Sequence, residues 1–118
     1  FAALGLAHLG ALPGTGAGWH LLGAGAVGMG VFVVIAIAGR AHAGLRPDAG
    51  PWIPLGGALI LAATGLRVAA ALQGWGGEAL AASAALWCLA YAVLLWRVGP
   101  GLWRARTDGR DGCDGPAD

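Results

Sequence analysis

The chain has 118 residues, of which 58% are hydrophobic and only 11% are charged, and its formal net charge is +1. Soluble domains carry about 25% charged residues, and a mean hydropathy of +0.70 leaves this chain too little polar surface to cover a compact globule in water. The composition excludes an ordinary soluble domain and predicts a lipid bilayer as the surroundings. The near-balance of charge also excludes a basic face for nucleic acid.

Long apolar stretches, taken in chain order, predict an all-α fold, namely a polytopic transmembrane helix bundle. A helix needs about 20 residues to cross the hydrocarbon core, and three stretches reach about that length, one of them interrupted only by an arginine. A shorter apolar stretch at the start indicates the end of a further span. The predicted spans are residues 1–12, 19–39, 52–73 and 79–97. We therefore expect three full spans plus the end of a fourth, and expect the remaining spans of a longer protein to pack against them.

Short connections rich in proline and glycine join these spans, so neighbouring spans are predicted to run antiparallel. Six of the seven arginines fall at the end that holds the second connection and the C-terminal segment: Arg40, Arg46, Arg97, Arg104, Arg106 and Arg110. The positive-inside rule makes this end cytoplasmic and places the turns at Pro13 and Gly74 outside. Residues 1–99 are thus expected to form the membrane bundle, and residues 100–118 a disordered, cytoplasmic polar tail.

Small residues recur at four-residue spacing in two of the predicted spans. This spacing lets helix backbones approach closely in lipid, although a chain with 23 glycines also produces it by chance. The pairs are Ala24 with Gly28, Ala26 with Gly30, and Ala58 with Ala62. They are candidates for close contacts between helices.

Histidine is the residue type most typical of a metal or haem site in this sequence, because neutral imidazole binds haem iron and copper. His20 and His42 lie at opposite ends of the second predicted span, 22 positions or about 33 Å apart along a helix, so they cannot share one metal within the chain. His8 and His20 flank the Pro13 turn and can lie at similar depth, which makes a shared site at the outer side possible. Alternatively, each histidine caps a helix or lies among lipid headgroups.

Arg67 is predicted to lie about five residues inside the third span, where a guanidinium must face protein, water or an anion. Glu78, across the Gly74 turn, and a cofactor carboxylate are its two candidate partners, and snorkelling to the headgroups is the alternative. Cys88 is predicted to lie near the midplane and is interpreted as a packing residue.

Several segments in their order along the chain resemble the C-terminal third of the NnrS family. These segments are Trp19–Met29, His42–Gly44, Leu66–Val68, Ala84–Trp87, Leu95–Pro100 and Arg106–Gly112. The resemblance implies a multi-pass protein of the bacterial inner membrane that is associated with haem, copper and the response to nitric oxide. It implies cofactor-binding roles for His20 and Arg67, and metal-binding roles for His20 and His42. His8 is a further cofactor-binding candidate because of its position across the Pro13 turn from His20.

Three functions follow from these observations. The first is haem and copper binding in nitric oxide metabolism or in protection from nitrosative stress, with no reaction assigned. The second is a transporter or channel segment in which Arg67 binds a small anionic solute. The third is an electron-transfer cytochrome subunit, which needs two histidines at matched depth on different helices.

Overall fold

The computed structural model describes residues 2, 5–6, 9, 15–106 and 109, and these residues form helices and short connections without any strand. Three helices in this part of the chain are long and apolar enough to cross a membrane: Gly16–His42, Trp52–Gln73 and Gly77–Leu102. The predicted all-α bundle with three full spans is confirmed. Most of the predicted fourth span, residues 1–12, lies outside the described residues, and so does Pro13.

The first long helix changes its hydrogen-bonding register along its length. Its consecutive segments are α2 (Thr15–His20), the π-helix η1 (Leu21–Val27), α3 (Gly28–Val34), the π-helix η2 (Ile35–Gly39) and α4 (Arg40–His42). The helix is longer than the predicted span 19–39 at both ends. Its end is set by Gly44, which has a φ of +70°, and by the Leu45 N–H, which donates to the Arg40 carbonyl at 2.9 Å. Together they form a Schellman-type cap.

Helix α5 (Trp52–Gln73) has the range expected from the sequence. Pro54 lies in its first turn, where the missing N–H would have had no helical partner. At the other end Gly74 adopts a left-handed φ of +67°, and the Trp75 N–H donates to the Ala70 carbonyl at 3.1 Å. At about 1.5 Å per residue, α5 is about 33 Å long and matches the hydrocarbon thickness.

Helix α6 (Gly77–Leu102) continues beyond residue 97, where the sequence had predicted its end, and passes through Pro100. Proline in the last turn costs only one helical hydrogen bond at an end where carbonyls already lack partners. The first residues of the expected tail, 100–102, are therefore helical. Of the remaining tail, residues 107–108 and 110–118 lie outside the described part.

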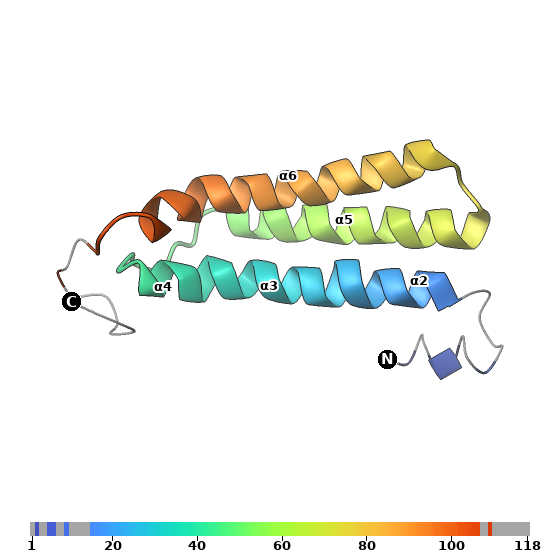
Figure 1. Ribbon diagram of the computed structural model, residues 1–118, viewed down its shortest axis with the longest axis horizontal. Helices are drawn as coiled ribbons and strands as arrows, with labels where there is room; N and C mark the ends of the chain where they lie inside the picture. Colours follow the sequence, from blue (N-terminus) through green and yellow to red (C-terminus); the bar gives the residue numbers. More distant parts are fainter. Residues whose placement is uncertain (1, 3–4, 7–8, 10–14, 107–108, 110–118) are drawn as a thin grey trace.

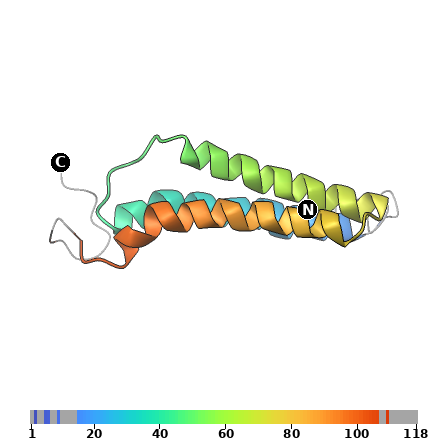
Figure 2. The same ribbon diagram turned by 90° about the horizontal axis from the view of Figure 1, so that it is seen from above.

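The three long helices lie side by side with alternating direction, as Figures 1 and 2 show. Phe32, Ile60, Leu94 and Val98 are the largest fully buried side chains and lie along the centre of the bundle. Large apolar side chains on the outside, such as Val34, Leu61 and Leu95, are exposed. An apolar exterior around a small interior is what a lipid bilayer requires.

Candidate functional site

The three long helices enclose a pocket of about 380 Å³ towards the end of the bundle that holds the Gly74 turn. Its lining comes from all three: His20, Gly23 and Ala24 from α2 and η1, Arg67 from α5, and Ser83, Ala84, Trp87 and Cys88 from α6. The pocket thus brings together two residues predicted as site residues, His20 and Arg67. Its volume lies within the range of about 300–1,000 Å³ typical of ligand pockets.

The π-helix η1 forms one wall of this pocket. Wider π-helical turns are uncommon and occur frequently at functional sites. The Trp87 Nε1–H donates to the Ala24 carbonyl at 3.3 Å, and the Tyr91 hydroxyl donates to the Gly28 carbonyl at 2.7 Å. These two bonds join η1 and the start of α3 to α6.

Aromatic stacking and a glycine complete this wall. The ring centroids of Trp87 and Tyr91 are 4.2 Å apart. A Cβ atom on Gly28 would lie 3.0 Å from Trp87 Nε1, so glycine at this position lets the indole approach the helix backbone. The Trp87 side chain is therefore held between the Tyr91 ring and the helix backbone at Gly28.

The Trp87 indole and the Ser83 hydroxyl, which also line the pocket, already have hydrogen-bond partners. The Ser83 hydroxyl donates to the Ala63 carbonyl at 2.8 Å across the α5–α6 contact. By contrast, neither the His20 imidazole nor the Arg67 guanidinium forms a hydrogen bond or an ion pair with another described residue. Both side chains are half-buried. The pocket therefore presents an imidazole and a cation that the fold itself does not use.

Arg67 does not pair with Glu78, the protein partner suggested by the sequence. Glu78 lies in the first turn of α6 and is exposed. No ion pair within 4.0 Å joins Arg67 to Glu78. The ion pair found within the described residues, between Arg40 and Asp48, is at the opposite end of the bundle.

His42, one of the other two predicted histidines, does not line this pocket. His42 is the last residue of α4, at the far end of the first long helix, and is exposed. Its backbone carbonyl accepts a hydrogen bond from Arg106 Nη1 at 3.4 Å. His8 lies outside the described residues. The described residues contain no group of three or more His, Cys, Asp or Glu side chains that can hold a metal ion.

Cys88, interpreted from the sequence as a packing residue, also lines the pocket. It is a free, exposed cysteine on α6. Ala84, which also lines the pocket, precedes it by four residues and so shares its helix face. The sequence placed Cys88 nearer the midplane than His20 and Arg67, so the four-residue spacing from Ala84 is the one signal that relates it to this pocket.

Comparison with known proteins gives one match. The family model described as NnrS protein matches residues 1–106, most of the chain. No curated protein and no solved structure matches it. The match agrees with the apolar three-span bundle and with the order of the sequence segments noted above. The chain belongs to the NnrS family of membrane proteins, which is associated with the nitric oxide response.

Proposed function

We propose that this chain forms part of a haem- and copper-binding protein of the bacterial inner membrane, and that the protein acts in nitric oxide metabolism or in protection from nitrosative stress. The observation that carries the proposal is the convergence of His20 and Arg67 on one pocket between three helices. Haem iron or copper, when bound, supplies a metal to which nitric oxide can coordinate.

His20 is the residue of this pocket that fits a metal-ligand role. Neutral imidazole is the commonest ligand of haem iron and suits copper as well. The His20 side chain is half-buried where α2 gives way to the π-helix η1, and no described residue occupies its ring nitrogens. A donor of the right chemistry is thus available on the pocket wall.

Arg67 fits the role of an anion partner for the same ligand. Placing a guanidinium near the centre of a span costs about 2.5–3.5 kcal/mol on insertion scales, and less nearer the interface. No carboxylate among the described residues offsets that cost by pairing with Arg67. A haem propionate would do so, because its two oxygens match the planar fork of the guanidinium.

The metal-binding role of His42 and the cofactor-binding role of His8 remain predictions, each for a different reason. His42 lies at the opposite end of its helix from His20, so any metal that it binds belongs to a second site. We propose a role for His8 beside His20, as expected from their matched distance from the Pro13 turn in the sequence.

Substitution of His20 tests the proposed ligand. In the protein of native length, His20→Ala is expected to lower the amount of bound haem or copper about tenfold or more. Loss of a residue that supports a metal ligand typically lowers metal affinity about 10–100-fold. Trp19→Phe is the matched control, because Trp19 is the exposed neighbour and does not line the pocket. Unchanged haem and copper content in His20→Ala, with normal amounts of protein in the membrane, would contradict the proposal.

Substitution of Arg67 separates its two candidate partners. Arg67→Lys keeps the charge but loses the two-donor fork, so it is expected to weaken haem retention or shift the haem potential, whereas Glu78→Gln leaves both unchanged. Measured haem content and redox titration distinguish these outcomes. Wild-type haem content and stability in Arg67→Leu would show that the guanidinium holds no anion in the pocket.

The same unpaired Arg67 favours a second candidate function, the binding of a small anionic solute by a transporter or channel segment. The absorption spectrum of the purified protein distinguishes the two functions. A Soret band retained through purification supports the haem proposal. Its absence, together with binding of an anion that is abolished in Arg67→Leu, supports solute binding. A haem that can be reduced but binds no added ligand would instead indicate an electron-transfer cytochrome.

A further inference from the structure

A second hollow lies at the opposite, arginine-rich end of the bundle. Its volume is about 260 Å³, and its lining combines two guanidinium groups with apolar atoms: Arg97 and Arg104 with Ala43, Leu45, Pro100 and Gly101. Gly101 allows this arrangement, because a Cβ atom there would lie 2.8 Å from Leu45 Cδ1. The connection after α4 therefore closes against the last turn of α6 and forms one side of the hollow.

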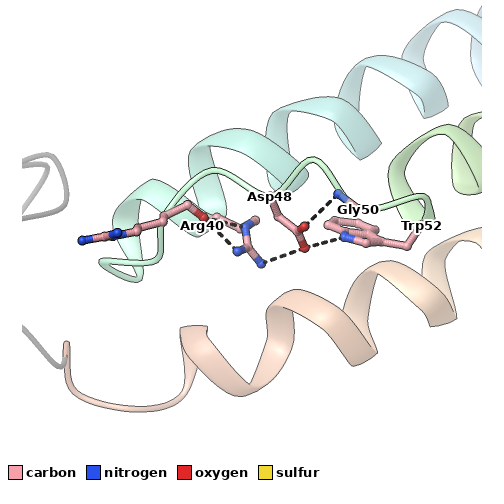
Figure 3. A network of polar contacts seen from close by, with 5 residues as sticks. Arg40, Asp48, Gly50 and Trp52 are labelled. Atoms are coloured by element: carbon pink, nitrogen blue, oxygen red, sulfur yellow. Dashed lines mark hydrogen bonds and ion pairs between the residues drawn. The ribbon is translucent and has the colours of Figure 1, made fainter.

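Among the described residues, the acidic side chain at this end of the bundle is Asp48, and it is already engaged. Figure 3 shows Asp48 accepting hydrogen bonds from the Trp52 indole at 2.7 Å and from the Gly50 N–H at 2.8 Å. Arg40 Nη1 lies 3.7 Å from the same carboxylate, and Arg40 Nη2 donates to the Arg46 carbonyl at 2.8 Å. Arg40 and Asp48 thus form an ion pair at the connection between α4 and α5.

Arg97 and Arg104 differ from Arg40 in this respect. Neither forms an ion pair with a residue that the structure describes. The Arg97 guanidinium lies 6.0 Å from the ring centroid of Trp52 and 5.8 Å from that of Trp96. Cation–π contacts hold the cation in place without cancelling its charge. Asp48 attracts Arg97 only as a smaller Coulombic effect and forms its ion pair with Arg40. The hollow is therefore lined by two arginines that form no ion pair with a described residue.

The position of the hollow along α6 indicates where that counter-ion comes from. Helix α6 has 26 residues, so it is about 39 Å long and exceeds a hydrocarbon core of about 30 Å. Its arginine-bearing end therefore extends into the headgroup layer. Trp96 and Trp103 beside the hollow are 75% and 87% exposed, as expected of aromatic residues at a membrane interface.

We propose that this hollow binds the phosphate group of an acidic phospholipid, with the Arg97 and Arg104 guanidinium groups as donors. Guanidinium matches phosphate oxygens with two parallel N–H bonds, and basic pockets of this kind between helices bind acidic headgroups. The lipid chains lie along the apolar surface of α6 on the midplane side of Arg97, where Leu89 and Leu95 are exposed. Free phosphate carries the same oxygens but has no chains to contact this surface.

Lipid titration of the purified protein of native length, followed by native mass spectrometry, tests this site. We expect dioleoylphosphatidylglycerol to bind in preference to dioleoylphosphatidylcholine. Each arginine near an acidic lipid surface strengthens binding about fivefold, so Arg104→Gln is expected to weaken phosphatidylglycerol binding about fivefold and Arg97→Gln/Arg104→Gln further. Arg104 follows the end of α6 and is exposed, so the single substitution leaves the bundle intact.

Arg46→Gln is the matched control, because Arg46 is exposed at the same end of the bundle but does not line the hollow. It is expected to bind phosphatidylglycerol more tightly than Arg104→Gln does. Equal losses in the two variants would show a diffuse surface charge and overturn the site. Binding of inorganic phosphate as tightly as phosphatidylglycerol, with displacement of the lipid, would overturn the assignment to a lipid.

Discussion

Asp48 shows how one side chain fixes the connection between two membrane helices. Its pKa lies below the usual 3.8. The largest cause is the hydrogen bond that the Trp52 indole donates to the carboxylate, followed by the hydrogen bond from the Gly50 N–H. Arg40 and Arg97 make smaller Coulombic contributions. Burial raises the pKa but does not outweigh these hydrogen bonds. The ionised form of Asp48 is therefore favoured in the folded protein.

Asp48→Asn tests this interpretation through the pH dependence of stability. The pKa of Asp48 is lower in the folded protein than in the unfolded protein, where it is about 3.8. The ionised carboxylate therefore stabilises the fold fully above the unfolded-state pKa. This stabilisation is lost as the pH falls through the folded-state pKa. We expect wild type to be more stable than Asp48→Asn at neutral pH, and the difference to shrink below about pH 4. Thermal unfolding in detergent micelles measures this. A difference that grows as the pH falls would contradict the assignment.

At the scale of the elements, glycines decide how closely the helices approach, and four-residue spacing identified only some of these glycines. Gly28 is buried against Trp87 as its predicted role requires, whereas Ala26, Gly30, Ala58 and Ala62 are exposed. Gly25 meets Thr64 instead, where an added Cβ atom would lie 2.9 Å from the threonine methyl group. Four-residue spacing locates a helix face but does not show whether that face meets protein or lipid.

Gly56 makes the tightest of these contacts. A Cβ atom there would lie 2.1 Å from Cζ of the fully buried Phe32. The ring also meets Trp52 and Tyr91 at centroid distances of 6.3 and 6.1 Å, which leaves it little room to move. Helices α3 and α5 can thus approach only because residue 56 has no side chain.

Gly56→Ala is expected to destabilise the bundle by about 1–3 kcal/mol, because overpacking forces the ring or the backbone to shift. The control is Gly65→Ala on the same helix, where an added Cβ atom meets nothing within 4 Å and alanine favours the helix. The measurement is the unfolding of the native-length protein in detergent. Equal stabilities of the two variants would show that the Phe32 contact does not limit helix packing.

For the whole molecule, the alternating direction of the helices (Figure 1) gathers most of the described arginines at one end, with Arg67 in the pocket towards the other end. The arginines at the first end are Arg40, Arg46, Arg97, Arg104 and Arg106. This asymmetry predicts that the arginine-rich end faces the cytoplasm. The pocket that holds His20 and Arg67 would then open towards the outer half of the membrane, and the proposed lipid site towards the inner leaflet.

Reporter fusions measure this orientation directly. Alkaline phosphatase, which is active only after export, is expected to be inactive when fused after Asp108 and active when inserted in the turn between Gly74 and Gly76. The paired fusions control for expression, since both report on the same protein. The opposite pattern would reverse the predicted orientation.

The sequence by itself determined that this protein is an all-helical membrane bundle, because span length and hydropathy depend on the bilayer thickness and need no tertiary contact. It also carried the family assignment. It did not place the helix ends at His42 and Leu102, which depend on backbone caps and on a tolerated Pro100.

Only the tertiary structure decided which side chains meet. It joined His20, Arg67 and Cys88 in one pocket, and Arg97 and Arg104 in another. A soluble helix shows its inner face by an apolar stripe, but a membrane helix is apolar towards lipid and towards its neighbours alike. Contacts such as Gly56 against Phe32 therefore set the rotation of each helix about its axis, and this rotation decides which residues line both pockets. The hydrophobic periodicity of the sequence does not predict this rotation.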